Sequence, residues 1–193
     1  KEIIATLPIE TFPGKIVVID NERDADNAVL QLNNERIIGF DTETRPTFKK
    51  GKSNHVALIQ LSTHDTCYLF RINRIGFTPA IKNLLENESL LKVGISLKDD
   101  FCMLSRLNGG QFIPKNFIEL QKFVKKYNIE DQSLQKIYGI VIGKKISKGQ
   151  RLSNWEADHL TENQQLYAAT DAWSCIKIYE VLKSGKFKSP IYK

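Results

Sequence analysis

Short apolar runs of strand length alternate along this chain with segments of helical period. In the first such segment, apolar residues recur every three or four positions, at Ala25, Ala28, Val29 and Leu32. This alternation is typical of an α/β domain, because strands and helices bury their apolar sides against one another. The pattern predicts strands at 15–20, 36–41, 55–62, 66–72 and 90–95, and helices at 21–33, 79–87, 97–107, 117–127, 132–139 and 166–182.

No internal boundary is visible in the sequence. The alternation is not interrupted by a repeat, a low-complexity tract or a linker rich in proline, glycine or serine. We therefore expect one domain over residues 1–193, with a mixed sheet flanked by helices. Two long segments without periodicity, 42–54 and 143–154, are basic, and long ordered loops in compact domains are often functional.

Composition excludes several classes of protein. The 193 residues carry 28 Lys and Arg against 22 Asp and Glu, a net charge of +6, and 41% are hydrophobic. That apolar content excludes a disordered polyelectrolyte, and no apolar run approaches the ~20 residues of a membrane-spanning helix. The first residues lack the apolar stretch of a secretory signal, so we expect an intracellular protein, cytoplasmic or in the nucleoid, with no membrane partner. The three separated cysteines, Cys67, Cys102 and Cys175, are predicted to be reduced thiols in the core.

The first pair of chemically informative residues is Asp41 and Glu43, at the end of an apolar strand. Side chains at i and i+2 share a face of a strand, so these two carboxylates point the same way. Oxygen ligands this close suit Mg²⁺ or Mn²⁺, whose charge reverses their repulsion. Taken alone, a motif of this kind is more often a solvated turn.

Further acids follow in two predicted helices. Tyr167 and Asp171 are four residues apart, and so share one face of the last helix. In the tandem Asp99-Asp100, the second acid is in register with the apolar side of its helix, whereas Asp99 is nearer the polar edge. We therefore prefer Asp100 as the inward acid, although both would also favour the positive end of the helix dipole.

The four acids come from three separate elements, each beside an apolar stretch. If they converge, they remain ionised together only around divalent metal. Two ions bridged by carboxylates are the arrangement that activates water and stabilises the leaving oxygen in phosphodiester cleavage. The predicted metal ligands are Asp41, Glu43, Asp100 and Asp171.

Three stretches of the sequence resemble the motifs of a known exonuclease group. These are FDTET, VGISLKDD and LSNWEADHLTENQQLYAATDAW, in that order. They are similar to the three motifs of the DEDD superfamily, in the branch with tyrosine in the third motif, which includes ribonuclease D and the exonuclease domain of the Werner syndrome helicase. The resemblance covers roughly residues 15–185 and implies a ribonuclease H-like fold and 3′-5′ exonuclease activity with two Mg²⁺ or Mn²⁺ ions.

The resemblance also implies roles for the matching residues. Asp41 matches the aspartate that bridges the metals, Glu43 and Asp171 match further ligands, and Tyr167 matches the tyrosine that holds the attacking water. The position six residues after the glycine of the second motif is Asp100. Where polymerase proofreading domains have an asparagine two residues after that glycine, this chain has Ser96.

The excess positive charge fits a phosphate-bearing partner, and the resemblance implies that this partner is nucleic acid with a single-stranded or recessed 3′ end. Lysines 49, 50 and 52 lie in one long loop, and lysines 144, 145 and 148 with Arg151 lie in the other; either group is also compatible with a plain solvated surface. The three histidines have no metal-ligand spacing, and both tryptophans are predicted to pack in the core. The candidate nucleic-acid contacts are Thr42, Ser96, Lys144, Lys145 and Arg151.

The leading hypothesis is therefore a metal-dependent exonuclease that releases nucleoside 5′-monophosphates from a 3′ end. The Werner-like stretches favour DNA, and the alternative is trimming of RNA 3′ ends, as implied by the resemblance to ribonuclease D. A second alternative is a catalytically silent nucleic-acid-binding module. The presence of all four acids and of Tyr167 counts against silence.

Overall fold

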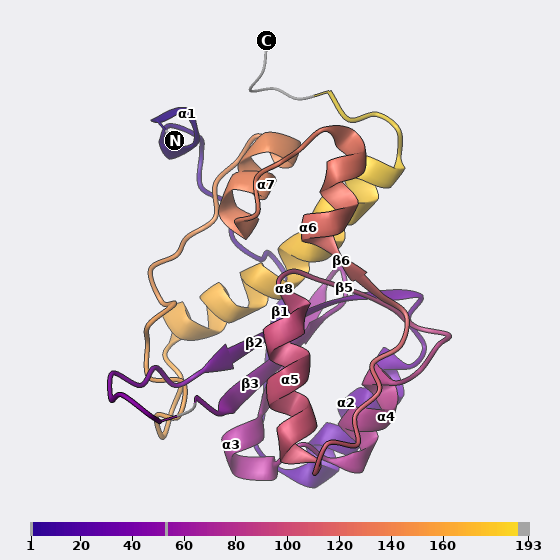
Figure 1. The fold of residues 1–193 in the computed structure, drawn as a ribbon, viewed down its shortest axis with the longest axis vertical. Helices are drawn as coiled ribbons and strands as arrows, with labels where there is room; N and C mark the ends of the chain where they lie inside the picture. The colour runs from indigo at the N-terminus through magenta and orange to yellow at the C-terminus, as the bar shows by residue number, and fades with distance from the viewer. Residues whose placement is uncertain (1, 53, 189–193) are drawn as a thin grey trace.

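The computed structural model describes residues 2–52 and 54–188, which form a six-stranded mixed sheet with helices on both faces (Figure 1). The strands are β1 (Lys15–Ile19), β2 (Ile37–Thr44), β3 (Val56–Ser62), β4 (Thr66–Arg71), β5 (Leu91–Gly94) and β6 (Phe117–Glu119), in the spatial order β1-β4-β3-β2-β5-β6. The β2–β3 and β3–β4 pairs are antiparallel, and the other neighbours are parallel. The predicted α/β class and ribonuclease H-like mixed sheet are confirmed.

Helices cover the two faces of the sheet with separate apolar clusters (Figure 1). One face packs against α6 (Leu120–Phe123), η1 (Val124–Tyr127), α7 (Leu134–Ile142) and the 22-residue α8 (Glu162–Lys183). The other packs against α2 (Glu22–Leu32), α4 (Pro79–Leu85) and α5 (Leu97–Leu107). The short α1 (Glu2–Ala5) and α3 (Ile72–Ile75) complete the described helices. Because β2 lies inside the sheet, its carboxyl end meets both layers.

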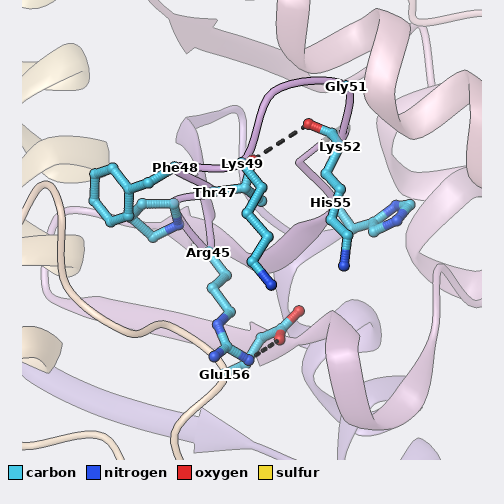
Figure 2. A pocket seen from close by; sticks show the side chains of 9 residues that line it. Arg45, Thr47, Phe48, Lys49, Gly51, Lys52, His55 and Glu156 are labelled. Atoms are coloured by element: carbon cyan, nitrogen blue, oxygen red, sulfur yellow. Dashed lines mark hydrogen bonds and ion pairs between the residues drawn. The ribbon is translucent and has the colours of Figure 1, made fainter.

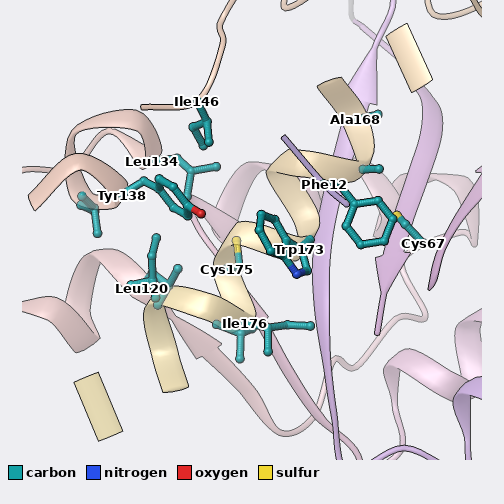
Figure 3. Close-up of a cluster of buried hydrophobic side chains, with 14 of the residues drawn as sticks. Phe12, Cys67, Leu120, Leu134, Tyr138, Ile146, Ala168, Trp173, Cys175 and Ile176 are labelled. Atoms are coloured by element: carbon teal, nitrogen blue, oxygen red, sulfur yellow. The ribbon is translucent and has the colours of Figure 1, made fainter. Parts of the chain in front are cut away.

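The helix α8 is the central element of the first layer. A capping box fixes its start: the Thr161 side chain accepts from the Gln164 backbone, and the Gln164 side chain accepts from the Thr161 backbone. Figure 3 shows Trp173 of α8 between Phe12 and the α7 side chains, and the two rings of Trp173 and Phe12 meet edge to face at 5.8 Å. Trp155 is also fully buried, so both tryptophans pack in the core as predicted.

Two sequence-based predictions are wrong. The helix expected at 117–127 begins as the strand β6, whose Phe117–Glu119 segment pairs with β5, and only then continues as α6 and η1. Cys102 is exposed on α5, whereas Cys67 and Cys175 are buried thiols. In the described part of the chain, none of the helices combines the length and apolar character needed to cross a membrane.

Candidate active site

Two acids stand at the end of β2 on the face covered by α8. Asp41 and Glu43 share this face, and Glu43 is only 8% exposed. The residues between and before them, Thr42 and Phe40, point to the other layer, because strand side chains alternate. The i, i+2 spacing in β2 therefore sets both carboxylates toward α8.

Close approach of α8 to β2 brings the third acid to this point. A Cβ added at Gly39 would lie 1.9 Å from the carbonyl oxygen of Ala172, so only glycine permits this helix–strand distance. Asp171 precedes Ala172 and is 5% exposed. The helix thus delivers Asp171 to the carboxylates of Asp41 and Glu43.

These three carboxylates form a compact group. One oxygen from each of Asp41, Glu43 and Asp171 lies within 4.8 Å of the other two. The buried Oδ1 of Asp171 has no hydrogen-bond partner. An unpartnered carboxylate oxygen among further carboxylates is chemically incomplete without a cation, and oxygen donors of this type fit Mg²⁺ or Mn²⁺.

Asp100 approaches the same cleft from the other layer. It is not one of the three carboxylates that lie within 4.8 Å of one another; instead its Oδ1 accepts a hydrogen bond from the Thr42 hydroxyl. Its neighbour Asp99 also lines the cleft but is exposed, whereas Asp100 is half-buried. All four predicted acids line one cleft of about 390 Å³.

Burial raises the pKa of the four predicted metal ligands in this cleft. Burial first, then the charges of Glu43, Asp171 and Asp100, hold the pKa of Asp41 well above its usual value. Burial and the charges of Asp171 and Asp100 do the same for Glu43. Burial raises the pKa of Asp100 to about 7 and that of Asp171 to about 7. The cleft therefore binds protons near neutral pH in the absence of a cation.

Gln60 lies under two of the carboxylates and was missed by the sequence analysis. It is fully buried in β3, and its Nε2 donates to Asp41 Oδ2 at 3.5 Å and to Glu43 Oε1 at 3.4 Å. The same nitrogen is 3.4 Å from the Ala168 carbonyl of α8. The signal in the sequence is a single amide within the apolar run VALIQL.

Tyr167 lies one helical turn before Asp171 and lines the acidic cleft. Its ring stacks on buried Trp155, with centroids 6.0 Å apart and planes inclined by 29°. Burial, followed by the charges of Asp171, Glu43 and Asp41, raises the pKa of the Tyr167 phenol. The hydroxyl therefore keeps its proton at neutral pH.

The start of α5 is fixed by a carboxylate from β6. Glu119 accepts hydrogen bonds from the backbone nitrogens of Ser96, at 3.0 Å, and Leu97, at 2.8 Å. The Ser96 hydroxyl accepts one from Gln121 Nε2 at 2.8 Å. Ser96 and Thr42 both line the cleft, with their hydroxyls held by neighbouring side chains.

The structure divides the basic residues of the second loop into two groups. Arg151 lines the cleft, together with Lys148, which was not among the selected contacts. Lys144 instead contacts Glu10 at 3.0 Å, and Lys145 donates to the Ala5 carbonyl at 2.7 Å. The structure therefore does not bring Lys144 and Lys145 to the cleft, because the N-terminal segment holds both.

Comparison with known proteins gives the class to which this fold and cleft belong. Residues 16–185 match the 3′-5′ exonuclease domain family. This match covers most of the chain, so the chain belongs to that family, whose activity is hydrolysis of nucleic-acid ends. The resemblance to the DEDD exonucleases is thereby confirmed.

Particular relatives agree with this assignment. The chain is 37% identical over 188 residues to the mouse bifunctional 3′-5′ exonuclease/ATP-dependent helicase WRN; the match covers 91% of this chain and 13% of that protein. The Nibbler EXO domain of Aedes aegypti superposes with a TM-score of 0.81 at 23% identity, covering 91% of each chain. RNase D of Escherichia coli superposes with a TM-score of 0.77 at 21% identity, covering 89% of this chain and 46% of that one. The latter two likenesses concern the fold.

Proposed function

We propose that this domain removes nucleoside 5′-monophosphates one at a time from the 3′ end of DNA, with two divalent ions, Mg²⁺ or Mn²⁺, as cofactors. The observation that carries the proposal is the group of three carboxylates within 4.8 Å, one of which has an unpartnered buried oxygen. Such a group requires a cation to be ionised at neutral pH. The domain is taken as a single unit over residues 1–193.

Each predicted metal ligand, and Tyr167, has a defined part in this proposal. Asp41, Glu43 and Asp171 would hold one ion, and Asp41 with Asp100 would hold the other. When bound, the ions would lower the pKa of the attacking water and offset charge on the leaving 3′ oxygen. The phenol of Tyr167 stays protonated and hydrogen-bonds the water, which orients it but does not deprotonate it. The rigid stack on Trp155 restricts the direction of that hydrogen bond.

Cations at the edge of the cleft suit the substrate. Lys148 and Arg151 line the same cleft as the acids and would contact phosphates of the strand. Thr42 and Ser96 line the same cleft and would contact the terminal nucleotide. The stretches of the sequence that resemble the Werner-type domain are the support for DNA, and the chain is 37% identical to the mouse WRN protein.

RNA is the second candidate substrate. The RNase D of Trypanosoma brucei, solved in complex with RNA U12, superposes with a TM-score of 0.76 at 20% identity and covers 93% of this chain. NrnC of Brucella melitensis, solved with pGG, also shares the fold, with a TM-score of 0.68. A third hypothesis, a silent binding module, conflicts with the presence of all four acids and Tyr167 in one cleft.

The test compares 5′-labelled DNA and RNA strands of one sequence, with Mg²⁺, with Mn²⁺ and with a chelator. We expect a ladder of products shortened from the 3′ end only when a divalent ion is present, with faster laddering of DNA. The Asp41→Ala and Asp171→Ala variants should remain folded and give no ladder. Absence of laddering on both strands would refute the exonuclease proposal, and faster RNA laddering would reverse the substrate assignment.

A further inference from the structure

A second hollow lies beside the acidic cleft and is not used by the proposed chemistry. It measures about 800 Å³ and is lined by residues of the loop between β2 and β3, including His55, and by Glu156 (Figure 2). We name residues 45–52 the basic arm. Its sequence, RPTFKKGK, contains four cations and no acid.

The basic arm begins at the active site itself. Arg45 follows Glu43 by two residues, which at the rise of a strand is a separation of about 7 Å. The β2–β3 register shifts between Glu43 and Thr44, and an irregularity of this kind redirects the chain that follows it. If the end of a polymer is bound at Glu43, the basic arm therefore lies within reach of the first one or two units from that end.

One contact joins the basic arm to a neighbouring loop, and another lies within the arm. Arg45 Nη1 lies 3.3 Å from Glu156 Oε2, as Figure 2 shows, and the Thr47 hydroxyl donates to the Lys52 carbonyl at 3.2 Å. The partner loop is fixed in turn, because Arg71 donates to the Asp158 carbonyl at 2.9 Å. The arm is thus joined to the loop that also carries Arg151 of the cleft.

One side chain of the basic arm is apolar and faces water. Phe48 is 87% exposed. Among the large apolar side chains that are exposed in residues 2–52 and 54–188, it has the highest exposed fraction. Lys49 and Lys52 follow it in sequence and line the hollow with it. An exposed aromatic ring among cations is the arrangement with which single-stranded nucleic acids are bound, by stacking of bases and contacts to phosphates.

We infer that the basic arm binds the single-stranded stretch immediately upstream of the scissile 3′ nucleotide, with Phe48 stacked on a base and Lys49 and Lys52 against phosphates. The inference rests on the proposed function, since it takes the strand end to lie among the acids. The partner is identified by its chemistry. The lysine side chains complement the negative charge of phosphates, and the flat ring of Phe48 can stack on a base whose face is not already stacked. A duplex offers phosphates to the lysines but keeps its bases stacked on one another, away from Phe48.

The test measures binding of a fluorescent single-stranded 15-mer to the full chain by anisotropy in a chelator, so that no cleavage occurs. The variants are Phe48→Ala and the double Lys49→Ala/Lys52→Ala. Leu30→Ala is the control for Phe48, because Leu30 is 65% exposed on α2. Lys183→Ala/Lys186→Ala is the control for charge, because these exposed lysines have the same spacing at the end of α8.

We expect Phe48→Ala to weaken binding of the single strand by about 5- to 100-fold, the range for loss of one base–aromatic stack. The double lysine variant should reduce the slope of log K against log salt by about 1.4, and both controls should leave binding within twofold. A 15-base-pair duplex should lose little affinity on removal of Phe48.

Two results would overturn the inference: binding by Phe48→Ala equal to that of Leu30→Ala, or an equal loss on the duplex. Cleavage by the unmodified chain with Mg²⁺ is measured separately. If no strand is cleaved while Phe48→Ala still loses single-strand affinity, the catalytic proposal fails and the binding surface remains. If cleavage is normal and Phe48→Ala binds like its control, only the basic arm is refuted.

Discussion

Gln60 shows how much one buried amide contributes to a group of acids. Its Nε2 reaches Asp41 and Glu43, so it fixes the relative orientation of two predicted metal ligands from below. We expect Gln60→Met, which keeps the volume but removes the donor, to weaken Mn²⁺ binding by about 10- to 100-fold. Isothermal titration of Mn²⁺ measures this directly.

The control for Gln60 is Leu58→Met, two residues earlier on the same face of β3. Both substitutions should change the free energy of unfolding by less than about 1.5 kcal/mol, because they conserve volume. Unchanged Mn²⁺ affinity in Gln60→Met would mean that the amide only fills space. Equal losses of affinity in both variants would point to packing as the cause.

Tyr167 gives a second prediction at the scale of a single residue. Replacing it with Phe retains the stack on Trp155 and removes only the hydroxyl. The single-turnover rate should fall by about 10- to 1000-fold, the effect of misplacing one catalytic hydrogen bond, with Mn²⁺ affinity retained. An unchanged rate would mean that the ring only packs, and lost Mn²⁺ binding would mean that the hydroxyl supports the ligands.

The adjacent acids Asp99 and Asp100 on α5 give a third prediction at this scale. Asp100 is half-buried and contacts Thr42, with its pKa raised to about 7, whereas Asp99 also lines the cleft but is exposed. Asp100→Asn should therefore abolish most of the activity in the strand-laddering assay, and Asp99→Asn should retain most of it. A greater loss at position 99 would show that the wrong acid had been chosen.

Residue patterns predicted some of these side chains and not others. Asp41 with Glu43, and Tyr167 with Asp171, follow from the fixed periods of strands and helices, so their shared faces are visible in the sequence. Contacts between distant segments are not visible in this way. Lys144 is held by Glu10, 134 residues earlier, and no local pattern indicates that pairing.

At the scale of elements, the approach of α8 to β2 decides where Asp171 lies. A methyl group at Gly39 would meet the Ala172 carbonyl oxygen at 1.9 Å, which is backbone and cannot rotate away. We expect Gly39→Ala to lower the free energy of unfolding by about 1 to 3 kcal/mol and to weaken Mn²⁺ binding as the helix shifts. Urea unfolding and Mn²⁺ titration measure the two effects.

Gly139→Ala on α7 is the matched substitution for Gly39→Ala. Its new methyl group would meet only side-chain atoms of Ile4, at 3.2 Å and beyond, and alanine favours a helix by up to about 1 kcal/mol over glycine. Stability and Mn²⁺ affinity should therefore stay close to those of the parent. A Gly39→Ala variant as stable as this control would contradict the close helix–strand contact.

Helices and strands were predicted correctly where the periodicity of the apolar residues agrees with their burial. They were predicted incorrectly where pairing with another strand determines the local structure. The apolar residues of 117–127 fit a helical spacing, yet Phe117, Ile118 and Glu119 pair in parallel with Lys92, Val93 and Gly94. Three residues of pairing at a sheet edge carry too weak a periodic signal to be seen in the sequence. This short strand matters to the site, because it holds Glu119 against the start of α5.

At the scale of the whole molecule, the acidic cleft links stability to pH. In the folded, metal-free chain the pKa values of Asp100 and Asp171 are about 7 and those of Asp41 and Glu43 are well raised, whereas unfolded carboxyls titrate near 4. Between about pH 4 and pH 7, the folded state therefore binds more protons than the unfolded state. The stability that these protons give is complete below about pH 4 and is lost as pH rises through about 7.

We therefore expect the metal-free chain to melt at a lower temperature at about pH 8 than at about pH 5, by on the order of 2 kcal/mol or about 4 to 8 °C. Mg²⁺ should restore most of this difference at the higher pH and change little at the lower, because it competes with protons for the same oxygens. Calorimetry in chelator and in Mg²⁺ measures both. The melting temperature of an Asp171→Asn variant should depend less on pH. If the melting temperature of the unmodified metal-free chain did not depend on pH, the raised pKa values would be contradicted.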